Sequence, residues 1–270
     1  MLYNFIMKTI KTKLSRAYKL SKISPKVSKQ NIDKMDEILK NSCYAKSLCP
    51  DEFLNFAKYY INWLFETNGI SPNLFEVKIK MTSQKEIEKV VGDCYAYAEY
   101  DYYTPMLTIT LNKEYFVIDY QKKGSNIKLK RVFTDFAHEC EHCVQRLNEF
   151  KTLMQKDCLE DFIENIKELG LPKKMLNQKL FCQGYTNKCE TDANQNAWVN
   201  LLYLINIFKQ NNQNHEEYQN FLSLLEYEIY KDKKIYKITT YRANLIEKRI
   251  DKKIKKTYKI DFSKLKVKVL

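Results

Sequence analysis

The spacing of apolar residues predicts helices on both sides of a short sheet. Residues 31–48 carry apolar side chains every three or four positions, which is typical of an amphipathic helix. In residues 51–67 the apolar side chains cover a wide arc, so a second helix should be buried in the core. Pro50, followed by Asp51 and Glu52, marks the start of this second helix.

In the middle of the chain the pattern changes to the two-residue period of a strand. Residues 75–81 alternate strictly between apolar and polar side chains, which indicates a half-buried strand. Residues 94–103 are rich in tyrosine and predict a second strand, and residues 106–111 predict a third. Because only a short turn separates them, the second and third strands should form an antiparallel hairpin. Residues 115–120 are expected to add another strand.

Helical spacing returns after the strands. Apolar residues predict a long, partly buried helix over residues 127–149 and further helices at 157–169 and 190–204. The predicted fold class is therefore α+β: a mostly helical domain with a small antiparallel or mixed sheet before the helix at 127–149. A last helix is expected at 240–256.

Length and charge divide the chain into three parts. A chain of 270 residues with 44% apolar content can bury one sizeable core. Residues 1–30 hold eight Lys or Arg and no acid (+8), and residues 231–270 hold 15 against four acids (15 − 4 = +11). The net charge of +13 then leaves 13 − 19 = −6 for residues 31–230. We therefore expect a domain over 31–230 between a basic N-terminal extension and a basic C-terminal tail.

Basic ends of this kind bind nucleic acid, an anionic membrane surface or an acidic partner, and they also occur as solvated tails. No apolar stretch reaches the length of about 18 residues that a membrane-spanning helix needs, so no transmembrane segment is expected. No secretory signal is recognisable. The eight cysteines are therefore expected to be reduced thiols in a cytoplasmic protein.

The pattern His138-Glu139-x-x-His142 carries the candidate chemistry. Two histidines four residues apart lie on the same face of a helix, where both imidazoles can bind one metal ion. Glu139 lies about 100° from His138 around the helix, so its carboxylate can reach a metal-bound water without being a ligand. This is the arrangement of a zinc peptidase, with two His ligands and a Glu general base.

Other residues of the metal-binding types are expected to be structural. Cys140 and Cys143 form a C-x-x-C pattern inside the same predicted helix, but a four-Cys zinc site needs a second such pair and the chain has none. We therefore expect both thiols to pack in the core. His215, the third histidine of the chain, is expected on the surface because it lies in a polar Asn/Gln loop.

Catalytic zinc usually has a third protein ligand. Glu190, at the start of its predicted helix, is the preferred candidate, because the small Ala193 one turn on lets that helix approach closely. Asp192 is the alternative, but it points about 200° away from Glu190. Asn194 lies on the face of Glu190 and is expected to hydrogen-bond the outer nitrogen of a ligand histidine. A role of Glu190 as a simple cap of the helix dipole stays open.

His138-Glu139-x-x-His142 and Glu190-x-x-Ala193 together resemble a zincin metallopeptidase of the gluzincin type and are similar to the ImmA/IrrE metallopeptidase family. The resemblance covers residues 50–205. In that family a small helix-rich domain with a short sheet carries the His-Glu-x-x-His helix, and a downstream Glu-x-x-Ala helix supplies the third ligand. The resemblance implies Zn²⁺ held by His138, His142 and Glu190.

The expected function is zinc-dependent hydrolysis of peptide bonds in an intracellular protein substrate, with Glu139 as general base. Residues 106–111 are expected to be a sheet edge that pairs with an extended substrate, or simply sheet core. A tyrosine such as Tyr185 is expected to stabilise the oxyanion. The alternative is a nucleic-acid- or membrane-associated binding protein with a structural or degenerate metal site, because tyrosines are interleaved with the lysines of the C-terminal tail.

Overall fold

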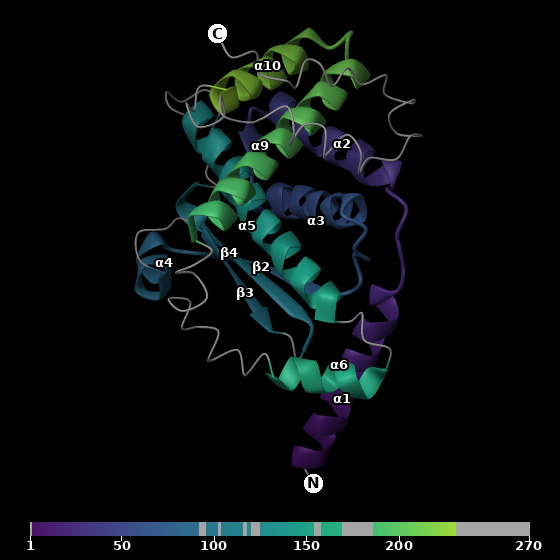
Figure 1. Ribbon diagram of the computed structural model, residues 1–270. Coiled ribbons are helices and arrows are strands. Elements are labelled where there is room, and N and C mark those ends of the chain that lie inside the picture. The colour runs from purple at the N-terminus through teal and green to yellow at the C-terminus, as the bar shows by residue number, and fades with distance from the viewer. Residues whose placement is uncertain are drawn as a thin grey trace.

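The computed structural model describes residues 2–91, 96–101, 104–115, 118–119, 125–153, 158–168 and 186–230. These residues form helices around a small sheet, which confirms the predicted α+β class (Figure 1). The helices are α1 (Leu2–Ser21), α2 (Lys29–Ala45), α3 (Pro50–Thr67), α4 (Gln84–Val91), α5 (Ser125–Leu153), α6 (Leu159–Glu168), α9 (Thr186–Asn211) and α10 (Glu216–Tyr230). The strands are β1 (Ser47–Leu48), β2 (Glu76–Thr82), β3 (Ala96–Asp101), β4 (Met106–Asn112) and β5 (Ile118–Asp119), and η1 (Lys113–Tyr115) is a 3₁₀ turn.

Helix α3 begins where the sequence predicts. The Cys49 backbone N–H donates a hydrogen bond to the Glu52 carboxylate at 2.9 Å, and the Glu52 N–H donates to Cys49 Sγ at 3.5 Å. This reciprocal pair is a capping box, and Pro50 occupies the first helical position, where its missing N–H costs nothing. The long helix predicted over 127–149 is also confirmed, because α5 contains all of it.

The helix predicted over 31–48 ends earlier than expected. Lys46 has a φ of 54°, the left-handed conformation that closes a helix, and its N–H donates to the Cys43 carbonyl. Ser47 and Leu48 then form β1, which pairs antiparallel with β5, so that Leu48 faces Ile118. The helix prediction is wrong for these last residues, because their strand partner lies far along the chain where a local pattern cannot indicate it.

The main sheet is mixed, with the strand order β2-β4-β3. The predicted hairpin is confirmed: β3 and β4 are antiparallel, with Ala98 opposite Ile109. Strand β2 is parallel to β4, with Val77 opposite Leu107. Strand β4 is therefore paired on both sides, and the expectation that Met106–Leu111 forms a free edge is wrong. Its alternative role as sheet core holds, and β3 lies at an edge of this three-stranded sheet.

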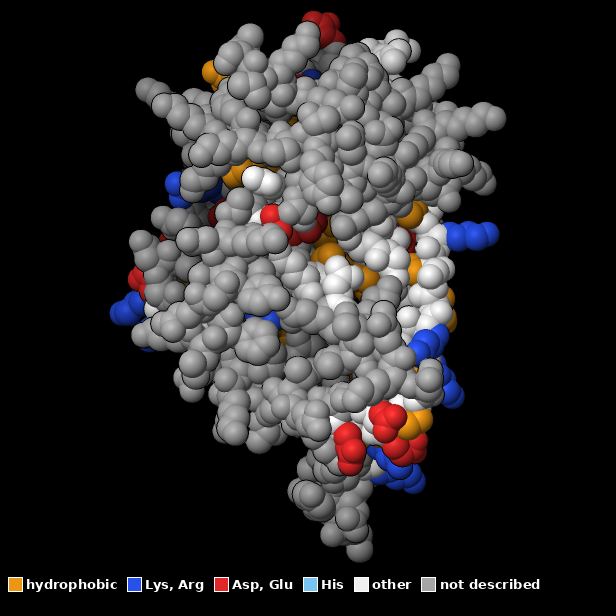
Figure 2. All heavy atoms as spheres, viewed as in Figure 1, with side chains coloured by type: hydrophobic (Ala, Val, Ile, Leu, Met, Phe, Trp, Pro, Cys, Tyr) orange, Lys and Arg blue, Asp and Glu red, His pale blue; other side chains and the backbone are white. Residues whose placement is uncertain are grey.

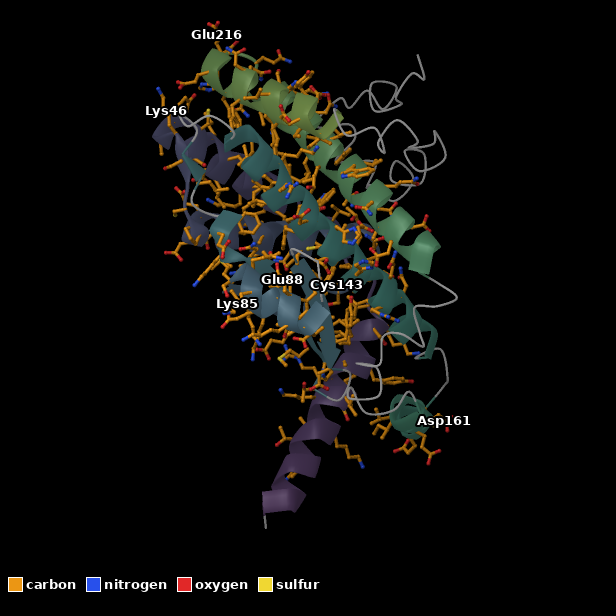
Figure 3. The ribbon with its side chains drawn as sticks, turned by 90° about the vertical axis from the view of Figure 1, so that its left-hand side faces the viewer. Lys46, Lys85, Glu88, Cys143, Asp161 and Glu216 are labelled. Carbon is orange, nitrogen blue, oxygen red and sulfur yellow. The ribbon has the colours of Figure 1, made fainter. Side chains whose placement is uncertain are left out.

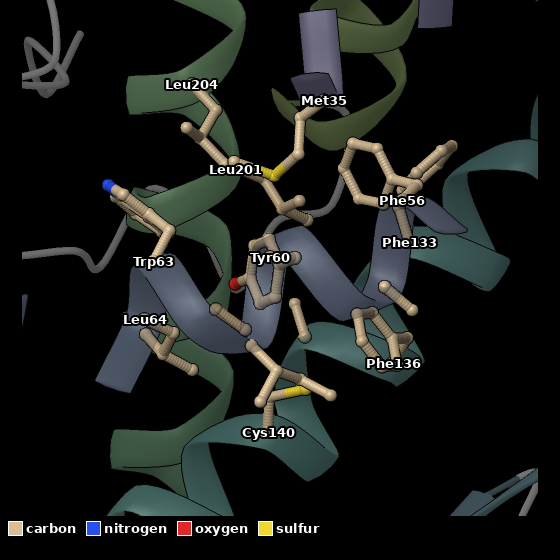
Figure 4. Close-up of a cluster of buried hydrophobic side chains, with 14 of the residues drawn as sticks. Met35, Phe56, Tyr60, Trp63, Leu64, Phe133, Phe136, Cys140, Leu201 and Leu204 are labelled. Atoms are coloured by element: carbon tan, nitrogen blue, oxygen red, sulfur yellow. The ribbon is translucent and has the colours of Figure 1, made fainter. Parts of the chain in front are cut away.

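Aromatic side chains join α3 to α5 and α9 (Figure 4). Phe56 of α3 packs edge to face on Phe133 of α5, with ring centroids 5.0 Å apart. Trp63 of α3 stacks on Tyr203 of α9 at 5.9 Å. Such pairs contribute about 0.5–1.5 kcal/mol each beyond the burial of their area. Both helices that carry the candidate ligands are therefore anchored on the same core helix.

Helix α9 packs across α5, and α10 follows it at the far end of the molecule (Figures 1 and 3). Helix α9 contains the predicted helix at 190–204 but extends beyond it at both ends. Helix α10 has no counterpart in the sequence prediction. Tyr218 and Leu222, which lie on the same face of this helix, are completely buried. The helix predicted at 157–169 is confirmed as α6.

Helix α1 packs on the body through Leu14 and Ala17, which are buried, while its described Lys and Arg side chains are exposed. The neighbouring α6 carries exposed acids, and Figure 2 shows acidic and basic side chains side by side at this end of the molecule. No helix in the described part of the chain is both long and apolar enough to cross a bilayer. The helix predicted at 240–256, as well as Tyr185, lies outside the described residues.

Candidate metal centre

Helix α5 places the two motif histidines one turn apart on the same face. Their Nε2 atoms are 2.9 Å apart, and the two rings are nearly perpendicular at an interplanar angle of 89°. The opposite face of this part of α5 carries Phe136, Ala137 and Cys140, which are buried in the core. The apolar spacing that predicted the helix therefore also turns the histidines toward α9.

Glu190 approaches this pair from α9. One carboxylate oxygen lies 3.1 Å from His138 Nε2, and the other lies 3.1 Å from His142 Nε2. Ala193, one turn further along, is fully buried, so no bulky side chain separates α9 from α5 at this point. The structure thus brings together His138, His142 and Glu190, the three residues that the sequence nominated, whereas Asp192 is not part of this group.

The donor set fits a zinc ion. Zinc accepts imidazole nitrogen and carboxylate oxygen at about 2.0–2.1 Å, and two atoms bound to one ion at that distance can be up to about 4 Å apart. The separations of 2.9–3.1 Å lie within this limit. The side chain of Glu190 is 55% exposed, against 15% for His138 and 18% for His142, so the group is open on the glutamate side. Three protein ligands with an open side are typical of a catalytic rather than a structural zinc site.

Gln145, which the sequence reasoning missed, orients His142. Its Oε1 lies 2.9 Å from His142 Nδ1, and because an amide oxygen only accepts, Nδ1 carries the proton. Nε2, which lies 3.1 Å from Glu190, is therefore the ring nitrogen that would bind a metal once its own proton is released, and holding the ring this way round is the usual role of a partner on the outer nitrogen. A residue three positions after a ligand histidine lies within reach on a helix, so this spacing is the signal that could have pointed to Gln145.

The predicted contact of Asn194 is not found. Its amide donates instead to the backbone carbonyl of Glu190 at 2.9 Å, one turn back along α9. The bond from Asn194 therefore supports the helix that carries Glu190 rather than a histidine ring. Among the described residues, the buried Nδ1 of His138 has no hydrogen-bond partner.

Glu139 lies beside the three candidate ligands and is only 8% exposed. It accepts a hydrogen bond from the backbone of Ala98 in β3, so the motif helix and the sheet meet at this carboxylate. Burial raises the pKa of Glu139, while His138 and His142 act to lower it. A buried carboxylate whose pKa is raised toward neutrality is a better proton acceptor and donor near pH 7 than an exposed one.

Electrostatics couple the three candidate ligands. Burial alone would lower the pKa of His142, but the Glu190 and Glu139 carboxylates raise it to about 9. The hydrogen bonds from both histidines hold the pKa of Glu190 well below its usual range. The group therefore favours a cation between these side chains, and a divalent metal ion supplies that charge.

The remaining candidates of the metal-binding types occupy structural positions, as expected. Cys140 and Cys143 are buried in the core, and burial raises the pKa of both thiols, so neither is poised to react or to bind a metal. His215 is exposed on the surface, where its ring contacts Lys40 and Tyr44 of α2.

Comparisons of the chain with models of protein families, with curated proteins and with solved structures found no match.

Proposed function

We propose that the protein is a zinc-dependent metallopeptidase of the gluzincin type, similar to the ImmA/IrrE family. The observation that carries this proposal is the convergence of His138, His142 and Glu190 within 4.8 Å of one another, with Glu139 buried beside them. A structural zinc site has no need for a neighbouring carboxylate that stays outside the ligand set. Under this proposal the ion is zinc, the substrate is a peptide or protein, and the reaction takes place inside a cell.

His138, His142 and Glu190 would hold the ion, and Glu139 would move the proton. When bound, zinc lowers the pKa of a coordinated water toward neutrality and polarises a carbonyl group. Glu139 accepts the proton of the attacking water at its carboxylate and returns it to the amine that leaves. The Ala98 N–H holds this carboxylate in place, and its burial favours the protonated form that the second transfer needs.

Strand β3 supplies a place for an extended substrate. The backbone of Ala98 hydrogen-bonds Glu139, and β3 lies at an edge of the described three-stranded sheet, so the β3 backbone groups that do not pair with β4 would be open to a peptide beside the motif helix. A peptide that lies along this edge would pair with β3 and pass beside Glu139. This assigns to β3 the role that the sequence reasoning gave to residues 106–111.

Elemental analysis and a single substitution test the proposal. Purified full-length protein should contain about one equivalent of zinc, consistent with three protein ligands and one open position. Glu139→Gln should keep this zinc and lose cleavage of a proteome-derived peptide library by about 10²–10⁴-fold, measured by mass spectrometry, because the proton acceptor is gone. Less than half an equivalent of zinc, or wild-type cleavage by Glu139→Gln, would contradict the proposal.

A further inference from the structure

The third candidate ligand lies on a different helix from the first two, so the site depends on how α9 sits against α5. One residue of slippage along α9 moves a side chain by about 1.5 Å and turns it by about 100° around the helix axis. Either movement would take the Glu190 carboxylate out of reach of the histidines. Apolar contacts between the two helices are not directional, and they tolerate such shifts better than a hydrogen bond does.

A buried hydrogen bond joins the same two helices away from the candidate ligands. Asn200 of α9 donates its amide to Glu141 Oε1 of α5 at 2.6 Å. Glu141 is 2% exposed and Asn200 is 5% exposed, so the pair is shielded from water. Breaking such a pair leaves a buried carboxylate and a buried amide that must find other partners, which costs about 1–3 kcal/mol for each group. The helix register that keeps the pair intact is therefore strongly favoured.

Glu141 and Asn200 lie on the same two helices as the candidate ligands. Glu141 directly precedes His142 on α5, but it points into the interface with α9 instead of to the ligand group. Asn200 follows Glu190 by ten residues, which is about 15 Å along α9. Two fixed points that far apart set both the translation and the rotation of α9 against α5.

The core helix α3 closes this polar contact from the third side. Burial raises the pKa of the Tyr60 phenol well above its ordinary value, with Cys140 and Glu141 acting in the same direction and Asn200 against it. Tyr60 is completely buried, so it leaves water no access to the pair from α3. A buried polar contact between two helices, covered by a third, is costly to keep in an apolar core and is often retained because it specifies one arrangement.

We propose that Glu141 and Asn200 are positioning residues for the metal centre, whose hydrogen bond sets the register of α9 and so places Glu190 against His138 and His142. The proposal rests on the proposed function for the identity of the ion, but the arrangement of the side chains can be tested without metal.

The decisive variant replaces both partners by apolar residues of similar volume, Glu141→Met together with Asn200→Leu. Such a replacement of a buried polar pair is often neutral or stabilising, so the variant should fold with wild-type stability in urea. If the pair only stabilises the fold, the metal centre should be unaffected. If it sets the register, zinc affinity measured by chelator competition should fall about 10–100-fold, as for other residues that orient ligands.

The three histidines provide the metal-free measurement. In ¹⁵N-histidine-labelled full-length protein, the double variant should move the ring resonances of His138 and His142 and leave that of His215 unchanged. The control variant Asn212→Ala should do the reverse, because Asn212 accepts a hydrogen bond from Lys40, which also contacts the His215 ring. Glu141→Gln keeps an acceptor oxygen in place and should give the wild-type spectrum.

The outcomes separate the two proposals. Unchanged His138 and His142 resonances in the double variant would overturn the positioning role, whatever the zinc affinity is. Moved resonances in a protein whose wild type binds no zinc would support the positioning role and refute the proposed function. Should the double variant not fold, Asn200→Ala is read in the same way, with Asn212→Ala as its control.

Discussion

At the scale of single residues, the hydrogen bond between Gln145 and His142 is the contact that prepares a ligand atom. Gln145→Ala removes the acceptor that holds the His142 proton on Nδ1 at 2.9 Å. The ring is then free to turn or to change its protonated nitrogen, so we expect zinc affinity to fall by about tenfold or more. Competition with a chelator of known affinity measures this change.

Gln30 gives the matched control, because it is an exposed glutamine on α2. Gln30→Ala should leave zinc affinity unchanged. Equal zinc affinity of Gln145→Ala and the wild type would show that Gln145 does not orient the ring. Both variants are expected to unfold in urea at nearly the wild-type midpoint, since neither removes buried apolar surface.

Local spacing explains which residues of the site could be predicted. The geometry of a helix alone brings His138 and His142 together, and it nominates Glu139 as their neighbour. Glu190 required the further assumption that its helix crosses α5, which Ala193 suggested through its small size. The partner of His142 was missed, and the contact predicted for Asn194 is wrong, because several polar residues lie within reach on a helix and only their packing decides which one bonds.

At the scale of elements, the buried carboxylate of Asp36 joins α2 to the turn after α9 and to α10. Asp36 accepts hydrogen bonds from the Asn212 amide at 2.8 Å and from the Tyr218 hydroxyl at 2.9 Å. Asp36→Ala leaves both buried donors without this acceptor, so the free energy of unfolding should fall by about 3 kcal/mol. Urea unfolding measures the loss, and a change within about 0.5 kcal/mol, typical of surface substitutions, would contradict it.

The same carboxylate predicts a dependence of stability on pH. Burial raises the pKa of Asp36, against the opposing effects of Asn212, Tyr218, Asn211 and the charge of Lys40. The folded protein then holds this proton at pH values where the unfolded chain, with a pKa of about 3.9, has lost it. The contribution of Asp36 to stability therefore decreases as pH rises from the unfolded pKa through the folded one, and it is constant above that.

Asp36→Asn does not titrate and isolates this contribution. We expect the difference in free energy of unfolding, wild type minus variant, to decline with increasing pH. The decline should begin at about pH 4 and then level off. Urea titrations of both proteins over this range measure the difference. A difference that grows with pH would mean that the folded pKa is lowered, and it would contradict the expectation.

Elements followed the sequence where their stabilising contacts are local. The alternation in 75–81 and the apolar arc in 51–67 correspond to β2 and α3 almost residue for residue. The helix prediction was wrong at Ser47–Leu48, whose partner strand is distant in the chain. The prediction of a free edge at residues 106–111 was also wrong, because β4 is the central strand. A two-residue period shows that a segment is a strand, but it does not show how many neighbours the strand has.

At the scale of the whole molecule, the basic N-terminal helix lies close to acidic side chains. Helix α1 contacts α6, and α6 carries the exposed acids Glu160, Asp161 and Glu164. Part of the positive potential of α1 is therefore neutralised within the molecule. The tail over 231–270 holds 15 Lys or Arg and four acids, a net charge of 15 − 4 = +11. If the protein binds a polyanion, the tail should contribute more than α1 does.

Salt dependence of binding to single-stranded DNA tests this difference in the full-length chain. Each cation that neutralises a phosphate contributes about 0.7 to the slope of log affinity against log salt concentration. Replacing Lys255 and Lys256 together by Gln should therefore reduce the slope by about 1.4. Replacing Lys11 and Lys13 in the same way should reduce the slope by less, because the acidic side chains of α6 compete with the phosphates for these two lysines. Equal reductions of the slope would show that the acids of α6 do not screen α1. If neither pair reduced the slope, the lysines of the basic ends would not contact the nucleic acid.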